Sequence, residues 1–154
     1  MRPSPPAYAI DLDGAIGDTR GIWTAWLADA ARVLPLDVDA LPDDRAGAAA
    51  TLDERGGNWR TLLERFAEER APVFLRPKAE TSAALRRLEA NGALLGVFTD
   101  APLELAQVAL SQLGATRRVS VVVTGSDALA RLVAELGDHA SVVRTTDELV
   151  AAAS

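Results

Sequence analysis

The second half of the chain alternates between short apolar runs and amphipathic segments of helix length, each bounded by turn residues. The pattern predicts a helix over 79–90, ended by Asn91 and Gly92, and then a buried strand over 93–98. Further helices and strands follow over 102–114, 119–123, 127–136 and 141–144, with a terminal helix from Asp147. Short strands separated by helices predict an α/β fold in which helices cover both faces of a parallel sheet. Ligands bind such sheets beyond the carboxyl ends of the strands.

The first apolar run of the chain ends in two carboxylates. The run between Pro6 and Gly14 has the length of a strand, and a regular strand would point Asp11 and Asp13, at its end, to the same side. Gly14 then lets the chain turn at once. Two adjacent carboxylates repel each other unless a proton or a cation joins them, and Mg²⁺ prefers oxygen ligands. From the tetrapeptide Asp-Leu-Asp-Gly alone, an ordinary acidic turn is as good an interpretation as an active site.

The composition excludes several classes of function. The 154 residues are enough for one compact domain, and the absence of cysteine rules out disulfides, thiolate metal sites and a cysteine nucleophile. The net charge is −6 and no basic stripe is present, so nucleic acid is not an expected partner. The single histidine, His139, is expected in a loop. Apolar runs of membrane-spanning length are absent, and the segment before the first strand is too short for a signal peptide, so we expect a cytoplasmic protein without a membrane partner.

The longer string that begins at the first acid, Asp-Leu-Asp-Gly-Ala-Ile-Gly-Asp-Thr, resembles the first motif of the haloacid dehalogenase superfamily of phosphohydrolases. Only Ala15 departs from that motif. The resemblance implies that Asp11 is the nucleophile that forms an aspartyl-phosphate, that Asp13 is the general acid and base, and that both help to bind Mg²⁺. Asp18 and Thr19 would fix the loop that leaves the site. A carboxylate suits the role of nucleophile because it is already ionised at neutral pH and divides the hydrolysis into two easier displacements.

The second motif of the superfamily is an apolar strand that ends in Ser or Thr, and the run that ends at Thr99 is similar to it. The resemblance implies that the Thr99 hydroxyl binds phosphoryl oxygens together with nearby backbone N–H groups. Gly14 and Asp100, which adjoin the two motifs, are expected to bind the substrate as well. A threonine at the end of a strand can also serve only as a cap, so the order of the motifs carries more weight than Thr99 alone.

A helical insertion separates the two motifs. This layout is similar to the branch of the superfamily with a small helical cap, which includes phosphoglycolate-phosphatase-like enzymes. It implies a three-layer, Rossmann-like core made of residues 1–19 and 76–154, with strand order 3-2-1-4, and a cap made of residues 20–75. Pro72 and Pro77 are expected to bracket an extended connection back to the core.

In the superfamily the cap selects the substrate, so cap residues are the candidates for substrate recognition. Asn58 and Arg60 follow a double glycine and are expected to hold a small phosphorylated metabolite. Three tryptophans also lie in the insertion, but they fall on apolar helix faces and are expected in the core.

The chain departs from the superfamily after the second motif. The family supplies a lysine there that neutralises the nucleophile and the phosphate, whereas the one lysine of this chain, Lys78, precedes Thr99. Arg131, or Arg117 and Arg118, could supply the positive charge instead. Arginine is not a simple substitute, because it carries a planar fork of donors rather than a compact charge.

The fourth motif of the superfamily, a strand that ends in Gly-Asp or Asp-Asp and completes the Mg²⁺ site, is also altered. The last strand ends near Arg144, and we predict Asp147 as the third metal ligand. With about 4.8 Å between neighbouring strands, Asp147 would lie one strand from Asp11 and Asp127 two strands away. The ordinary alternative for Asp147 is the N-cap of the terminal helix. Another alternative is that a helix and a strand have been deleted, so that residues 142–149 are the superfamily's final strand and helix.

Three functions are consistent with this pattern. The first is a Mg²⁺-dependent phosphatase of a small phosphorylated metabolite. The second is a non-catalytic protein that keeps the fold and binds a metal, a phosphorylated ligand or a protein partner. The third is a phosphoacceptor domain similar to a response-regulator receiver, which the acidic pair, the inserted cap and the missing late lysine disfavour. We favour the first because the first motif is retained at Asp11, Asp13, Asp18 and Thr19. The oligomeric state is not predicted.

Overall fold

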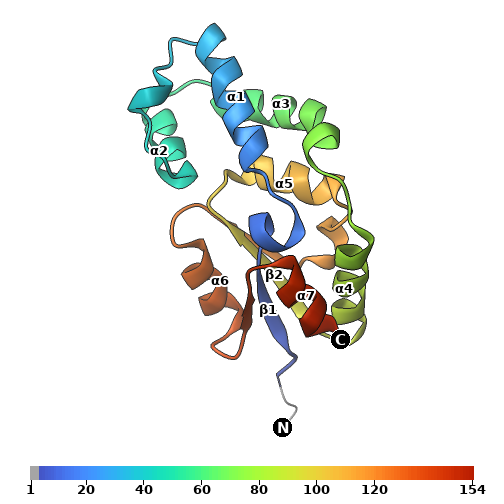
Figure 1. Cartoon of the computed structure of the whole chain (residues 1–154). Coiled ribbons are helices and arrows are strands. Elements are labelled where there is room, and N and C mark those ends of the chain that lie inside the picture. Colours follow the sequence, from blue (N-terminus) through green and yellow to red (C-terminus); the bar gives the residue numbers. More distant parts are fainter. Residues whose placement is uncertain (1–3) are drawn as a thin grey trace.

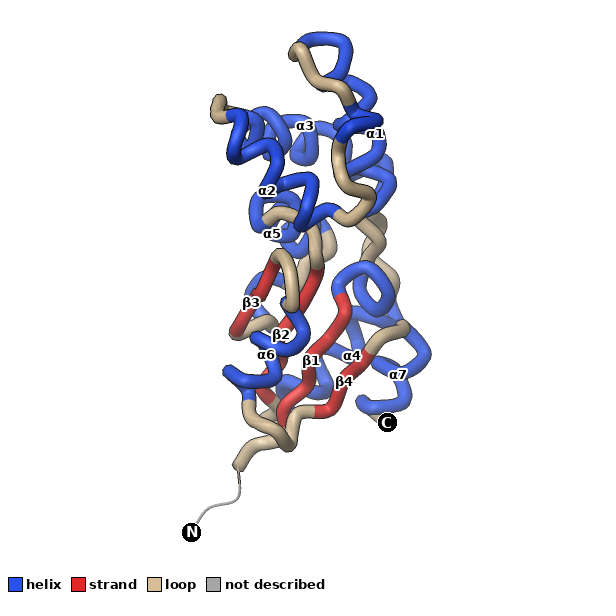
Figure 2. Tube along the Cα trace, turned by 90° about the vertical axis from the view of Figure 1, so that its left-hand side faces the viewer, coloured by secondary structure: helices blue, strands red, loops and turns tan. Residues whose placement is uncertain are grey.

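The computed structural model of the chain describes residues 4–154, and residues 1–3 of the predicted core segment lie outside the described residues. Its four strands form one parallel sheet in the order β3-β2-β1-β4, with helices on both faces (Figures 1 and 2). This confirms the predicted fold class and strand order. In chain order the elements are β1 (Ala7–Asp11), η1 (Leu12–Ile16), α1 (Arg20–Val33), η2 (Val38–Ala40), α2 (Arg45–Arg55), α3 (Trp59–Phe74), α4 (Ala79–Ala90), β2 (Leu94–Thr99), α5 (Leu103–Gln112), η3 (Thr116–Arg118), β3 (Val121–Thr124), α6 (Ala128–Leu136), β4 (Ser141–Val143) and α7 (Thr146–Ala153).

The two faces of the sheet are covered by different helices. On one face α6 packs against β1, β2 and β3, and a small apolar cluster forms around the buried Leu132. Gly96 of β2 permits this close approach, because a Cβ atom there would collide with the side chain of Leu132. On the other face α4 and α7 pack against each other, and the larger apolar core continues from there into the helices that follow β1.

The helices α1, α2 and α3 lie beyond the carboxyl ends of the strands, as Figure 1 shows. Their own core contains Trp23, Trp26 and Trp59, which are all buried. The ring centroids of Trp23 and Trp26 are 5.4 Å apart, and those of Trp26 and Trp59 are 5.9 Å apart. The prediction that the tryptophans belong to the core is therefore confirmed. α3 also packs against α5, so apolar contacts hold this group of helices over the strand ends.

α3 is longer than predicted. It continues through Pro72 to Phe74, whereas an extended segment was expected directly after this proline. Pro72 lacks the N–H that would bond to a carbonyl one turn earlier, and only two helical residues follow it before α3 ends. The chain becomes extended at Leu75. Neither α3 nor any other helix within residues 4–154 has both the length and the apolar composition needed to cross a membrane.

Candidate active site

The two acids of the first motif are held by a single turn of π-helix. β1 ends at Asp11, and η1 begins at the next residue and closes with a hydrogen bond from the Gly17 N–H to the Leu12 carbonyl, at 2.9 Å. The backbone N–H of Asp13 donates to Asp11 Oδ1 at 3.1 Å. Isolated π-turns are frequent at functional sites. The turn places both carboxylates at the carboxyl edge of the central strand, as the motif predicts.

Asp11 faces a cavity of about 570 Å³, which we call the strand-end cavity. The cavity lies between the ends of β1 and β2, the β3–α6 loop and the start of α2. Burial raises the pKa of Asp11, and the negative charge of Asp13 adds to the rise. The backbone N–H groups of Gly14 and Asp13 and the guanidinium of Arg144 oppose this rise without cancelling it. Within residues 4–154, no side chain forms a hydrogen bond or an ion pair with the Asp11 carboxylate.

Asp13 has the opposite environment, because both of its oxygens are occupied. Thr19 donates to Oδ1 twice, from its backbone N–H at 2.8 Å and from its hydroxyl at 2.6 Å. The Thr99 hydroxyl donates to Oδ2 at 2.9 Å, and Arg45 donates to the same oxygen at 2.6 Å. The resulting set of charge-assisted bonds fixes the orientation of the Asp13 side chain.

Arg45 is the site residue that the sequence analysis missed. It is the first residue of α2 and is only 4% exposed, which is rare for an arginine. Its guanidinium contacts the carboxylates of Asp13 and Asp100 and the hydroxyls of Thr19 and Thr99, at distances of 2.6 to 3.3 Å. Its backbone N–H also donates to Asp100, at 3.2 Å. The sequence around Arg45 signals only a helix start, and the one available hint was that the missing lysine left a positive charge to be supplied.

Five of the predicted site residues do converge. β1 and β2 are neighbouring parallel strands, with Asp11 paired in register with Phe98, so Thr99 and Asp100 emerge beside the acids of the first motif. Asp11, Asp13, Thr99 and Asp100 line the strand-end cavity, and the backbone N–H of Gly14 lies near enough to the Asp11 carboxylate to oppose the rise of its pKa.

The two predicted substrate residues of the cap lie elsewhere. Asn58 lines a separate, mostly apolar pocket of about 180 Å³ beside Trp59. Arg60 bonds to Asp53 and Glu104 at 2.8 to 3.1 Å and stacks on the Trp59 ring. Its charge is therefore paired with these two carboxylates. Neither residue lines the strand-end cavity.

None of the arginines suggested as substitutes for the lysine reaches the Asp11 carboxylate. Arg131 donates to the backbone carbonyls of Thr124 and Ser126 and so braces the β3–α6 loop instead. Arg117 and Arg118 belong to η3, which precedes β3 and therefore lies at the opposite edge of the sheet from the site. Arg118 pairs there with a glutamate of α4.

Asp147 does not join the acids of the first motif. It is exposed in the first turn of α7, and the N-cap of that helix is Thr145, whose hydroxyl accepts from the Glu148 N–H at 3.1 Å. Both the metal-ligand and the N-cap interpretations of Asp147 therefore fail to match its position. Among residues 4–154, no three acidic or histidine side chains are grouped to hold a metal ion.

The donor set at the strand ends does not fit the Mg²⁺ ion that the resemblance implies. The resemblance implies three carboxylate ligands, and Mg²⁺ requires its oxygen ligands in near-octahedral coordination. Here Asp13 and Asp100 are bound to Arg45, which leaves Asp11 as the only carboxylate of the three without a cationic partner in the part of the chain described. Arg144 further offsets its charge.

Gly14 is required by close packing rather than by a special backbone angle. A Cβ atom at this position would overlap the backbone carbonyl oxygen of Arg144. We expect Gly14→Ala to cost about 1–3 kcal/mol of unfolding free energy, because the connection between β4 and α7 must shift. Urea denaturation would measure this loss. Gly21→Ala is the matched control, since its Cβ would meet only the partly exposed ring of Phe74, and equal stability of the two variants would contradict the prediction.

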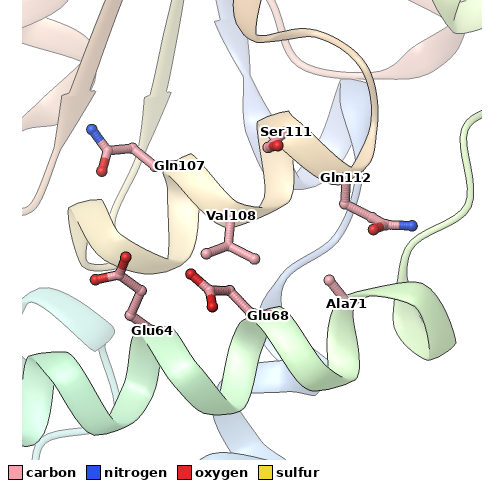
Figure 3. Close-up of a pocket in the computed structure, with 7 residues that line it drawn as sticks. All are labelled: Glu64, Glu68, Ala71, Gln107, Val108, Ser111 and Gln112. Atoms are coloured by element: carbon pink, nitrogen blue, oxygen red, sulfur yellow. The ribbon is translucent and has the colours of Figure 1, made fainter.

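A second cavity, of about 400 Å³, lies between α3 and α5. Figure 3 shows Glu64 and Glu68 extending from α3 toward α5, from which Val108 points toward them. This groove is lined by acids and amides and shares no residue with the strand-end cavity. None of the candidate catalytic groups lines this groove.

Comparison with known proteins supports the fold independently of the motifs. No family model matches the sequence, and neither does any curated protein. Among solved structures the chain is similar to the crystal structure of a Thermotoga maritima protein assigned as a beta-phosphoglucomutase, a member of the haloacid dehalogenase superfamily. The TM-score is 0.54 at 18% sequence identity, over 96% of this chain and 81% of the other. The chain therefore shares its α/β fold with that structure, and this agrees with the fold that the two motifs implied.

Proposed function

We propose that this protein is a phosphoryl-transfer enzyme that hydrolyses the phosphate ester of a small metabolite through an aspartyl-phosphate on Asp11. The observation that carries the proposal is the environment of Asp11. Its carboxylate ends the central strand, faces the strand-end cavity and has no side-chain partner among residues 4–154. An attacking group must be free in this way, whereas the neighbouring Asp13 is fully bonded.

In the first step an oxygen of Asp11 attacks the phosphorus atom, the bond from phosphorus to the ester oxygen breaks, and the leaving oxygen takes up a proton. In the second step water attacks the aspartyl-phosphate and releases inorganic phosphate and the Asp11 carboxylate. We assign the proton transfers to Asp13, and to Oδ2 in particular, because Thr19 fixes Oδ1 through two hydrogen bonds. Thr99 and Arg45 both contact Oδ2 and would position it.

The size of the cavity favours a small substrate. At about 570 Å³, the strand-end cavity falls in the range of about 300–1,000 Å³ that is typical of small-molecule sites. α2 closes one side of it through Arg45, so a bulky macromolecular substrate would require the cap to move.

The proposal is tested by phosphate release. The purified chain, incubated with an aryl phosphate and with a panel of phosphorylated sugars and acids, is expected to release inorganic phosphate from at least one of them. The same panel is run with the Asp11→Asn variant, which must be inactive. Release at equal rates from both proteins would identify a contaminating phosphatase and contradict the proposal.

One observation favours a second function, that of a non-catalytic binding protein. The guanidinium of Arg45 already donates to Asp13, Asp100, Thr19 and Thr99. The arginine and the Thr99 hydroxyl, which would bind a phosphate, therefore have hydrogen-bond partners within the protein itself. No release from any member of the panel, with a folded protein, would select this second function over the first.

A further inference from the structure

The guanidinium of Arg45 is surrounded by the kind of ligands that a metal cation would have. Within 3.3 Å its nitrogens contact carboxylate oxygens of Asp13 and Asp100 and hydroxyl oxygens of Thr19 and Thr99. These four residues come from three separate segments of the chain: the loop after β1, the start of α1 and the end of β2. One cation thus joins oxygens from all of them.

The position of Arg45 is also shielded from water. Its side chain is 5% exposed and that of Asp13 is 13% exposed, so the pair lies in a region of reduced dielectric constant, where an uncompensated charge is costly. Asp100 is more open, at 44%. Removing the arginine would leave two carboxylates, with Asp11 as a third beside them, and no lysine is among the described residues that line the strand-end cavity.

We propose that Arg45 is the resident cation of this site: it neutralises Asp13 and Asp100 and thereby excludes a divalent metal ion from them. Arginine is suited to this role because its charge is permanent and its planar fork can serve two carboxylates at once. The position of the metal is thus taken by a side chain that the cap delivers. The inference goes beyond the proposed function, since it concerns metal binding and holds whether or not the site turns over a phosphate ester.

The test is metal binding, measured on the whole chain by calorimetric titration with Mn²⁺ and by thermal melts with and without millimolar Mg²⁺ at matched ionic strength. We expect the wild type to show no saturable binding and no shift in Tm. Arg45→Met is expected to gain a site, because the carboxylates of Asp13 and Asp100 and the hydroxyls of Thr19 and Thr99 then lose the cation that they surround. Mg²⁺ should raise the Tm of this variant by several degrees through binding to the native state. Adding Asp100→Asn to Arg45→Met should weaken that site at least tenfold.

Arg118→Met is the matched control. It removes a guanidinium from an ion pair with Glu89, far from the strand ends, and should leave the protein without a metal site. If Arg45→Met does not fold, Arg45→Gln keeps an N–H donor toward Asp13 without the charge and is expected to bind Mn²⁺ in its place. The wild type alone can overturn the proposal: a saturable Mn²⁺ site that Asp11→Asn abolishes would show that the metal and Arg45 are bound together. Failure of Arg45→Met and of Arg45→Gln to bind metal while folded would overturn it equally.

Discussion

Replacing Asp11 by asparagine is expected to lower the kcat of phosphate release by about 10³-fold or more. An amide is nearly isosteric with the carboxylate, and it can still accept the Asp13 N–H at the end of β1. It cannot form the aspartyl-phosphate. The measurement is the steady-state rate on the best substrate of the panel, together with acid trapping of the phosphorylated protein in the wild type and its absence in the variant.

The same substitution is expected to stabilise the fold at neutral pH. Because burial raises the pKa of Asp11, the folded state binds the proton of this group more tightly than the unfolded state does. The contribution of Asp11 to stability is therefore fully present below its unfolded pKa of about 3.9 and is lost as the pH rises through the raised folded pKa. Asparagine does not ionise, so Asp11→Asn avoids the decrease in unfolding free energy that ionisation of Asp11 causes in the wild type.

The comparison of wild type and Asp11→Asn by urea unfolding at pH 4 and pH 7 tests the sign. From pH 4 to pH 7 the unfolding free energy of the variant should rise relative to that of the wild type. In a separate measurement, the acid limb of the pH profile of kcat/KM in the wild type should report a pKa above the ordinary value of an aspartate. An equal stability difference at both pH values would show that the Asp11 carboxyl is not destabilised by burial.

Replacing Asp13 by asparagine is expected to have the opposite effect on stability. Asp13 accepts four hydrogen bonds, and its partner Arg45 is buried. An asparagine would point an N–H group at one of these donors and leave the guanidinium without one of its two carboxylates. Breaking a buried pair on one side typically costs about 3–5 kcal/mol, and we expect a loss of that order.

Asp18→Asn is the matched control for this prediction. Asp18 also pairs with an arginine, Arg20, but both side chains are well exposed, and an exposed pair contributes only about 0–1 kcal/mol. Urea unfolding should separate the two variants clearly. In activity, Asp13→Asn should lose about 10²–10⁴-fold, because the proton transfers lose their carboxyl group. A stability for Asp13→Asn equal to that for Asp18→Asn would mean that the network around Arg45 contributes nothing.

The signs of these two predictions depend on the three-dimensional surroundings, since the sequence assigns the two acids different roles but does not show their different environments. Both lie in one motif that follows the first apolar run. The tertiary structure separates them: Asp11 is partly buried without a side-chain partner among residues 4–154, and Asp13 lies among donors from Thr19, Arg45 and Thr99. Opposite stability changes from identical substitutions, two residues apart, would be the direct measure of that difference.

By itself the sequence determined the sheet and the place of the site within it. The spacing of apolar residues and the turn residues are local signals, so the strands, the helices between them and the acids that follow the first strand could be predicted. The parallel topology then places Thr99 and Asp100 at the same end of the sheet as those acids. The extension of α3 past Pro72 was missed because a proline inside a helix normally ends it, whereas here two further residues stay helical.

Only the tertiary structure decided which charges meet at the strand ends. Arg45 and Asp100 are separated by 55 positions, and no periodicity marks an arginine at a helix start as buried. Their contact depends on how α3 docks on α5 and so sets α2 over the sheet. Likewise, Arg131 follows β3 and Asp147 follows β4, as predicted. The Arg131 side chain, however, donates to carbonyls of the β3–α6 loop, and Asp147 is exposed to solvent. Strand order places a residue near an edge, whereas the direction of a long side chain depends on which partners the packed helices leave within its reach.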